Sequence, residues 1–314
     1  MKKYDAIIIG SGQGGTPLAK KLAERGYHTA LVEKRWVGGT CVNDGCTPTK
    51  AMVASAKAVD HIRNSDQLGI HAGKHTTDIE AIITRQRNMV SSFRTGSEKQ
   101  LLSTENLDLI YGEASFTGHK KIRVKPRSGD AQELHADLIF INTGTRPSAP
   151  GIEGIETVPY LTSTSILELK ELPEHLLIIG GGYVGMEFAQ MYRRFGSQVT
   201  MVVRSDRLAK TEDEDISKEI LNLFQAENID IRLNAETLQL NTDAGKIKAV
   251  VKSNSEEETI TCSHILMATG RRPQTDTLNL PATNVNTNEN GFIKVDNQLQ
   301  TNVKGVFALG DVNG

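Results

Sequence analysis

Two cysteines separated by four residues, Cys41 and Cys46, lie in the segment G-G-T-C-V-N-D-G-C-T-P-T-K at residues 38–50. A pair at this spacing on a glycine-rich loop can close a small disulfide ring. We expect Thr47 to cap a helix and Pro48 to take its first position, which places Cys46 just outside the helix N-terminus. The positive end of the helix dipole favours a thiolate at Cys46. The pair therefore predicts dithiol–disulfide exchange.

Other uses of these cysteines fit the sequence less well. A structural disulfide is typical of exported proteins, and the apolar stretch behind Lys2 and Lys3 breaks at Gly10, too early for a signal peptide. Zinc needs a second cysteine or histidine pair to complete four ligands, so no metal site is expected. The third cysteine, Cys262, stands in a predicted strand and is expected to be a core residue.

A glycine-rich turn follows the apolar run at residues 6–9, which reads as a buried parallel strand. The glycines of the pattern G-x-G-x-x-G stand at Gly10, Gly12 and Gly15. An acid, Glu33, ends the next predicted strand 23 positions after the first glycine. This order of strand, turn, helix, strand and acid is typical of a dinucleotide-binding fold, in which the backbone approaches a pyrophosphate at a helix N-terminus.

The same pattern returns in the second half of the chain. The apolar strand 176–179 leads into Gly180, Gly182 and Gly185, then a predicted helix, then a strand at 199–203. Two such fingerprints, each between a strand and a helix, predict two dinucleotide sites.

A second repeat indicates how the two folds are connected. The strands 135–142 and 262–268 each end in T-G-x-R-P, at residues 143–147 and 269–273. We interpret these as the two crossings between a discontinuous first domain, residues 1–148 and 273–314, and an inserted second domain, residues 149–272.

The cysteine segment resembles the signature G-G-T-C-x-N-x-G-C-x-P-x-K of class I pyridine nucleotide-disulfide oxidoreductases, the family of lipoamide dehydrogenase, glutathione reductase and mercuric reductase. The resemblance covers the whole chain, including A-L-G-D at residues 308–311, which is similar to the family's second FAD motif. It implies an α/β fold of two Rossmann-like domains, with the FAD domain discontinuous, the NADPH domain inserted and the C-terminal interface domain absent.

The resemblance also implies roles for individual residues. Cys46 is the thiolate that faces the flavin, and Cys41 is the interchange thiol that attacks the substrate. Lys50 lies near the flavin and pairs with Glu187, while Tyr183 gates the nicotinamide pocket. The implied cofactor-binding residues are, for FAD, Gly10, Gly12, Gly14, Gly15, Glu33 on the ribose, Lys34, Gly39, Thr40, Lys50, Thr143, Gly144, Gly310 and Asp311 on the ribityl chain, and, for NAD(P)H, Gly180, Gly182, Gly185 and Gly270.

The choice of nicotinamide cofactor follows from spacing. The position 23 residues after Gly180 is Val203, where an NAD-binding fold needs a carboxylate for the ribose 2′-hydroxyl. Arg204, Arg207 and Lys210 follow, and cations are what a 2′-phosphate requires. We therefore predict NADPH, with Arg204 as its main contact and Lys210 or Arg207 as the second.

The expected reaction passes electrons from NADPH through FAD to the Cys41–Cys46 disulfide and on to a disulfide or a soft metal ion, as in mercuric reductase, because thiolates prefer soft ions. A glutathione reductase-like or dihydrolipoamide dehydrogenase-like enzyme is the alternative. The family continues past the second FAD motif into a domain that supplies dimer contacts and a His-Glu pair. A nucleotide-binding fragment without turnover is therefore a further alternative.

Composition excludes several classes of partner. The chain has 314 residues, 36 basic and 38 acidic side chains and a net charge of −2, with 38% hydrophobic residues. This near-neutral balance argues against binding to nucleic acid or to a membrane surface. We expect a small-molecule or metal-ion substrate, a cytoplasmic location with a role in cell redox homeostasis, and a homodimer for the full-length parent.

Overall fold

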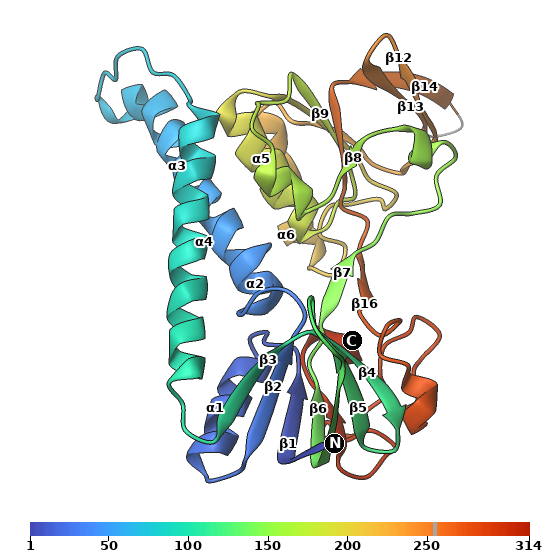
Figure 1. Ribbon diagram of the computed structural model, residues 1–314. Coiled ribbons are helices and arrows are strands. Elements are labelled where there is room, and N and C mark those ends of the chain that lie inside the picture. The colour runs from blue at the N-terminus through green and yellow to red at the C-terminus, as the bar shows by residue number, and fades with distance from the viewer. Residues whose placement is uncertain (254–255) are drawn as a thin grey trace. The chain divides into compact units, whose positions relative to one another are not determined.

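The computed structural model describes residues 1–253 and 256–314 of the chain, which divide into two compact units (Figure 1). Unit 1 contains residues 1–47, 89–146 and 271–314, and unit 2 contains residues 48–88 and 147–270. Each unit is described by itself. The predicted domain boundaries at 148/149 and 272/273 stay a prediction. The two units are defined by which residues pack together. By this measure residues 48–88 belong with the second nucleotide fold.

Unit 1 is built on a seven-stranded sheet with the order β3-β2-β1-β6-β5-β4 and with β17 paired to β6. The pairs β1·β2, β1·β6, β2·β3 and β6·β17 are parallel, whereas β4 and β5 join as an antiparallel hairpin. The strands are β1 (Lys2–Ile9), β2 (Thr29–Glu33), β3 (Leu107–Tyr111), β4 (Glu113–Gly118), β5 (Lys121–Lys125), β6 (Gln132–Ile141) and β17 (Val306–Ala308). The helical segments are α1 (Gly15–Glu24), α2 (Gly39–Asn43), η4 (Leu280–Thr283) and η5 (Asp311–Asn313).

Unit 2 repeats this topology with a five-stranded parallel sheet in the order β11-β10-β9-β15-β8. A separate antiparallel meander, β12-β13-β14, follows β11 in the chain. The strands are β8 (Tyr160–Leu161), β9 (His175–Ile179), β10 (Gln198–Val202), β11 (Asp230–Arg232), β12 (Ala235–Asp243), β13 (Lys246–Ser253), β14 (Glu256–Cys262) and β15 (His264–Met267). The helical segments are α5 (Tyr183–Phe195), α6 (Glu214–Ala226), η2 (Ile155–Thr157) and η3 (Ser165–Glu168). The predicted α/β class with two Rossmann-like folds is confirmed.

Two long helices and a short strand pair span the boundaries between the units along the chain. The helices are α3 (Cys46–Arg63) and α4 (Ile79–Leu102), joined through η1 (Ser65–Leu68). The strand pair is β7 (Thr145–Pro147) with β16 (Arg271–Pro273), which are the two T-G-x-R-P crossings. In the described part of the chain, no helix combines the length and the apolar character needed to cross a membrane.

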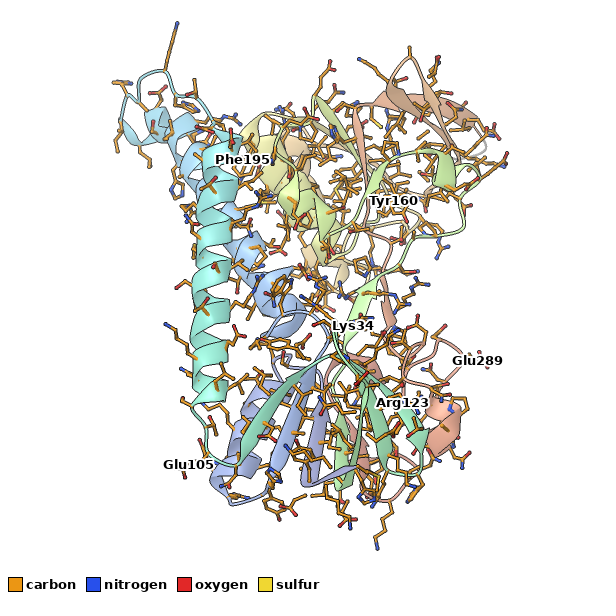
Figure 2. All side chains as sticks on the ribbon, viewed as in Figure 1. Lys34, Glu105, Arg123, Tyr160, Phe195 and Glu289 are labelled. Atoms are coloured by element: carbon orange, nitrogen blue, oxygen red, sulfur yellow. The ribbon has the colours of Figure 1, made fainter. Side chains whose placement is uncertain are left out.

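Each unit has its own hydrophobic core. In unit 2, α5 buries Phe188, Tyr192 and Phe195 at the helical spacing of three or four residues, and Phe195 is labelled in Figure 2. Met52 of α3 and Ile83 of α4 belong to the same core cluster. This packing explains why residues 48–88 group with the second nucleotide fold.

Candidate functional site

A cavity of about 440 Å³ lies in unit 1, within the range of volumes typical of ligand pockets. It lies at the ends of parallel strands, where α/β folds bind their ligands. Its lining comes from seven segments of the unit: residues 9–14, 32–36, 39–44 except 42, 112–114, 142–145, 274–278 except 275 and 276, and 310–311. The lining therefore contains the first glycine turn, one cysteine and the second FAD motif.

The first glycine turn is packed so tightly that its glycines are required. A Cβ on Gly10 would stand 2.4 Å from the backbone oxygen of Asn142, and a Cβ on Gly15 would stand 2.1 Å from that of Gly10. The second turn repeats both contacts, with 2.2 Å from Gly180 to the oxygen of Ala268 and 2.5 Å from Gly185 to that of Gly180. Both turns thus bring a strand end against a helix start, which is the geometry that a pyrophosphate needs.

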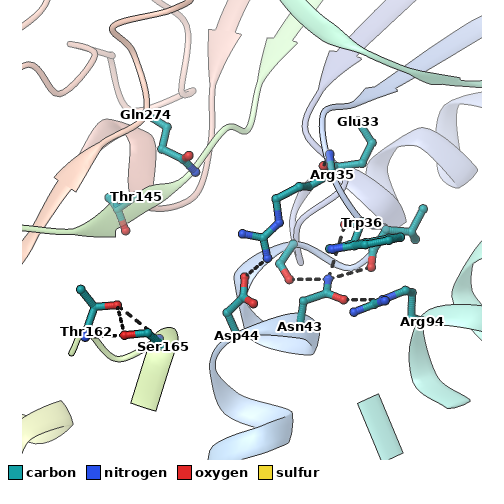
Figure 3. Close-up of polar contacts among 12 residues, drawn as sticks. Glu33, Arg35, Trp36, Asn43, Asp44, Arg94, Thr145, Thr162, Ser165 and Gln274 are labelled. Carbon is teal, nitrogen blue, oxygen red and sulfur yellow. Dashed lines mark hydrogen bonds and ion pairs between the residues drawn. The ribbon is translucent and has the colours of Figure 1, made fainter. Parts of the chain in front are cut away.

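Glu33 ends β2 with its carboxylate at the cavity (Figure 3). Its Oε2 accepts hydrogen bonds from the backbone nitrogen of Ser11 at 3.0 Å and from the Ser11 hydroxyl at 2.6 Å. Its Oε1 accepts from the backbone nitrogen of Arg35 at 2.6 Å. Since a carboxylate has about four acceptor positions, the fixed Glu33 carboxylate retains capacity for a ribose hydroxyl. Lys34, labelled in Figure 2, follows it and pairs with Glu113 at 2.6 Å.

The opposite part of the lining comes from the segments after β6 and β17. The Thr143 hydroxyl oxygen is buried without a hydrogen-bond partner among the described residues, so a bound ligand would satisfy it. Asp311 accepts a hydrogen bond from the Thr145 hydroxyl at 3.3 Å, and Thr145 in turn accepts from Arg271 Nε at 2.7 Å. Gly144 and Gly310, both at positive φ, lie beside these side chains in the lining. These groups and the glycine turn fit the pyrophosphate and sugar hydroxyls of a dinucleotide such as FAD.

The two cysteines of the signature lie in unit 1 as free thiols. Cys41 is half-buried in α2 and lines the cavity, whereas Cys46 is exposed. Burial raises the pKa of the Cys41 thiol to about 11, and its hydrogen bond with Cys46 acts in the same direction. Cys41 is therefore a protonated thiol at neutral pH, with Cys46 as its immediate partner.

The predicted start of the cysteine-bearing helix is wrong by two residues. Cys46 is the first residue of α3 and does not precede it, so Thr47 is not the cap and Pro48 is not the first residue. The segment before it is not a loop, because residues 39–43 form the short helix α2. Cys41 thus takes its orientation from helical backbone. By contrast, the prediction that Cys262 is a core residue is confirmed, since its exposed fraction is 1%.

The glycines of the signature fix α2 against the first glycine turn. Gly39 has a φ of +60°, and a Cβ there would stand 2.7 Å from the Cα of Gly12. Thr40 follows in α2 and also lines the cavity, while Gly14 precedes α1 as its cap residue. The chain therefore holds the cysteine segment directly on the turn that would bind the pyrophosphate.

In unit 2, Lys50 of α3 forms an ion pair with Glu187 of α5. The Tyr183 hydroxyl lies 3.2 Å from that of Thr211 and also hydrogen-bonds Glu212, and Tyr183 is 57% exposed. The geometry brings Lys50 and Glu187 together, while their proposed roles beside cofactors stay predictions.

The second glycine turn has no carboxylate at the ribose position, since Val203 is buried with an exposed fraction of 2%. Arg204 is exposed and has no hydrogen bond or ion pair within the described residues. Arg207 is already engaged, with Nη1 on Glu214 at 2.9 Å and Nη2 on the backbone oxygen of Lys210 at 3.4 Å. Gly182 precedes α5, with no atom within 4 Å of a Cβ placed there, and Gly270 has a φ of +128°. Arg204 is thus available for a phosphate, and so is Lys210, which is exposed and whose side chain has no partner within the described residues.

Sequence reasoning missed several residues that build the first site. Asn142, the last residue before T-G-x-R-P, donates its side-chain amide to the backbone oxygen of Gly10 at 3.3 Å. Ser11 fixes the Glu33 carboxylate. The only available signal for Asn142 was its place at the end of a predicted strand, because its contact with the glycine turn spans 132 positions.

The family profile described as pyridine nucleotide-disulphide oxidoreductase matches residues 4–314. The chain belongs to this family. The resemblance read from the cysteine signature is therefore confirmed, and the cofactors of such oxidoreductases are FAD and NAD(P)H.

Relatives within the family carry several different names. The chain is 38% identical to a mercuric reductase of Streptomyces lividans, covering 98% of this chain and 65% of that protein. It is 37% identical to the probable pyridine nucleotide-disulfide oxidoreductase RclA of Escherichia coli, covering 100% and 67%, and 33% identical to a dihydrolipoyl dehydrogenase of Chlamydia muridarum, covering 99% and 66%.

Solved structures agree with this assignment. The Cu(II) complex of the HOCl-induced flavoprotein disulfide reductase RclA from Escherichia coli matches with a TM-score of 0.89 at 36% identity, over 100% of this chain and 67% of that one. The chain spans 65% of the length of the mercuric reductase of Streptomyces lividans and 56% of that of Lysinibacillus sphaericus.

Proposed function

We propose that this chain carries the nucleotide-binding and dithiol parts of an NADPH-dependent flavin disulfide oxidoreductase that reduces a disulfide or a soft metal ion. One observation carries the proposal. Cys41 lines the same cavity as the first glycine turn and Asp311, so a dithiol and a dinucleotide site share one wall of unit 1.

The proposed binding residues have distinct tasks at this cavity. The backbone of the glycine turn and the N-terminus of α1 would hold the pyrophosphate of FAD. Glu33 would accept from the adenosine ribose and Asp311 from the ribityl chain, each held by neighbouring hydroxyls. Bound FAD would supply the transfer of an electron pair from NADPH to the Cys41–Cys46 disulfide.

The two cysteines then perform the exchange. Reduction of their disulfide takes two electrons and two protons and yields two thiols. A substrate disulfide is reduced when Cys41 loses its proton and attacks one of the two sulfurs, which releases the first substrate thiolate. Cys46 then loses its proton and attacks the mixed disulfide to release the second, and the two protons end on the two released thiols. We further propose that Lys50, four residues after Cys46 in α3 and paired with Glu187, stabilises negative charge during these steps.

A soft metal ion is the favoured alternative to a substrate disulfide. Two adjacent thiols, once deprotonated, provide the soft ligands that Hg(II) or copper prefers. Two relatives bear names or titles that mention such metals, as mercuric reductase and as a Cu(II) complex. The metal here is a substrate that receives electrons. NADPH as the donor is supported by Val203 and by Arg204, which has no partner in the part of the chain that the structure describes.

The full-length protein is proposed to work as a cytoplasmic homodimer. Three free cysteines among the described residues suit a reducing compartment. Sedimentation of the full-length protein tests the dimer, and cell fractionation tests the location.

The experiment first asks for bound flavin by absorbance and by titration with FAD. NADPH and NADH oxidation are then followed with Hg(II), Cu(II), oxidised glutathione and lipoamide as separate acceptors. We expect FAD binding and NADPH consumption that depends on both cysteines, so that Cys41→Ser and Cys46→Ser abolish it while Cys262→Ser leaves it unchanged. Preference for NADH with lipoamide would identify the dihydrolipoamide dehydrogenase-like alternative. Binding of both nucleotides without consumption under any acceptor would identify a nucleotide-binding fragment without turnover.

A further inference from the structure

Two arginine side chains hold the segment between the two cysteines (Figure 3). One bonds the side chain of Asn43 and the other bonds that of Asp44, the next residue. Arg94 of α4 donates from Nε to the side-chain oxygen of Asn43 at 2.7 Å. Arg35 donates from Nη2 to the carboxylate of Asp44 at 2.5 Å. All four residues belong to unit 1, and neither arginine is part of the cysteine signature.

Asn43 connects Arg94 to the backbone of α2. Its side-chain nitrogen donates to the backbone oxygens of Val37 at 2.9 Å and Gly39 at 2.8 Å, with Trp36 more distant at 3.4 Å. With its oxygen accepting from Arg94, this 9% exposed side chain uses both of its donors and one acceptor position. The bonds join the last residue of α2 to its start, with Cys41 in the middle.

The Arg94 guanidinium is itself fixed in place. Its central carbon lies 4.3 Å from the centre of the Trp36 ring, and that of Arg127 lies 5.2 Å from the same ring. Stacking on the indole face restricts the guanidinium to one plane. The Nε–H donor lies in that plane and stays free to bond a group beside the ring. No carboxylate pairs with Arg94 within the described residues, so its charge acts on the Asn43 oxygen. A charge-assisted bond of this kind is stronger than one between neutral groups.

The Arg35–Asp44 pair is the weaker of the two restraints. Its side chains are 52% and 19% exposed, so water screens the Arg35 charge. Exposed ion pairs contribute only about 0 to 1 kcal/mol. Arg94 acts on a buried amide that makes two further bonds, and the loss of Arg94 therefore affects three hydrogen bonds together.

We propose that Arg94 is a positioning residue for the dithiol, acting through Asn43 to hold α2 so that the Cys41 and Cys46 sulfurs can join. This inference rests on the dithiol chemistry of the proposed function. Arg94 does not itself line the cavity, but it contacts two residues that do, Asn43 and Trp36. Of these two, Asn43 belongs to α2, so we expect the effect of Arg94 on the cysteines to pass through Asn43.

The consequence is an effect on the dithiol–disulfide equilibrium. Closing the ring converts two thiols and one oxidised glutathione into the intramolecular disulfide and two reduced glutathiones. The equilibrium constant of this reaction measures the effective concentration of one cysteine thiol at the other. This effective concentration falls when α2, which carries Cys41, moves more freely. We expect Arg94→Met, which keeps the apolar stem, to lower the constant about tenfold, equivalent to about 30 mV.

The test equilibrates each variant with glutathione buffers and counts free Cys41 and Cys46 by alkylation and mass spectrometry. Arg94→Lys keeps the charge but not the planar Nε, so we expect an intermediate fall. Asn43→Asp keeps the acceptor but loses both donors, and we expect a fall that is not additive with Arg94→Met. Arg123→Met, on β5 of the same unit and paired with Glu133 at 2.7 Å, is the matched control.

The outcomes separate this proposal from the proposed function, because the measurement needs neither NADPH nor flavin. A wild-type chain that forms no Cys41–Cys46 disulfide would overturn the dithiol function itself. If the wild-type chain, Arg94→Lys and Arg94→Met all form the Cys41–Cys46 disulfide with the same glutathione equilibrium constant, only the role of Arg94 would be overturned. A shift in urea midpoint without a shift in the glutathione equilibrium would likewise reduce Arg94 to a structural residue.

Discussion

Single side chains decide which nicotinamide cofactor the second fold would accept. Val203 occupies the position where a carboxylate would bind a ribose 2′-hydroxyl and repel a 2′-phosphate. Arg204, the next residue, is exposed and unpaired among the described residues, whereas Arg207 already has Glu214 as partner. Lys210 is likewise exposed without a side-chain partner among the described residues, so Arg204 as the main contact and Lys210 as the second stay predictions.

Reversing the charge at Arg204 should reverse the cofactor preference. A phosphate contact made by a charged hydrogen bond contributes about 1.5–3 kcal/mol, so we expect Arg204→Glu to weaken NADPH binding by roughly 10- to 100-fold. NADH binding should remain or improve. Calorimetric titration of both nucleotides measures this, with Lys218→Glu on α6 as the control of equal charge change. Unchanged preference for NADPH would falsify the assignment.

The alkylation of Cys41 should follow its raised pKa. Because burial and the Cys46 hydrogen bond favour the neutral thiol, the reactive thiolate forms only as pH rises toward about 11. The rate of Cys41 modification by iodoacetamide should therefore keep increasing beyond pH 9, where an ordinary cysteine levels off. Peptide mapping after short pulses gives the profile. Cys262, with a pKa near 12 and almost no exposure, should stay unmodified in the folded chain and reports any unfolding. A Cys41 profile that levels off near pH 8.5 would contradict the described burial.

At the scale of elements, both glycine turns and the strands that precede them follow from the sequence. Short apolar runs such as residues 6–9 and 176–179, each followed at once by a glycine, favour buried strands. The strands β1 and β9 do end at residues 9 and 179. The apolar residues of α6 (Glu214–Ala226) likewise recur at the spacing that indicates a helix.

The elements around the cysteines were harder to predict. The five residues of α2 are too few for any periodicity, and its glycines argue for a loop. The Asn43–Arg94 bond links residues 51 positions apart, and the Thr145–Arg271 bond links residues 126 apart. Such contacts depend on how the elements pack, which residue types alone do not specify.

The start of α1 gives a test of the glycine turn. Alanine within a helix is normally favoured over glycine by up to about 1 kcal/mol, but a Cβ on Gly15 would stand 2.1 Å from the Gly10 oxygen. We expect Gly15→Ala to destabilise the protein by roughly 1–3 kcal/mol in urea unfolding. Gly96→Ala on exposed α4, with nothing within 4 Å, should be neutral or stabilising. If the two variants are equally stable, the first glycine turn must be able to move and accommodate a Cβ at residue 15.

At the scale of the whole molecule, the chain repeats one architecture twice. The parallel strands β3-β2-β1-β6-β17 of unit 1 correspond in order to β11-β10-β9-β15-β8 of unit 2. Each unit has its own core and its own glycine turn, and we therefore expect each to bind its nucleotide through its own residues.

Ligand-dependent protection should therefore be confined to one unit at a time. A ligand at 100 times its Kd stabilises the form that binds it by about 2.7 kcal/mol. We expect FAD to slow amide exchange in β1, α1 and β6, and NADPH to slow it in β9, α5 and β10. Hydrogen exchange with mass spectrometry resolves these segments, and NADH at the same concentration is the control. Protection of both units by NADPH alone would show that the two folds respond together.

The β7–β16 strand pair limits how the gene for such a protein can be rearranged. Gln274 donates its backbone N–H to the oxygen of Gly144, and Ser148 does the same to Gly270, so the chain leaves and re-enters unit 1 at adjacent points. This favours exchange of the intervening segment by recombination, since an insert with neighbouring ends leaves its host intact. Met52 and Ile83, however, lie outside that segment and are buried in its core. A replacement insert must therefore also bury these two side chains. Viable exchanges are thus confined to inserts that keep the apolar face of α5, which shares a core with both.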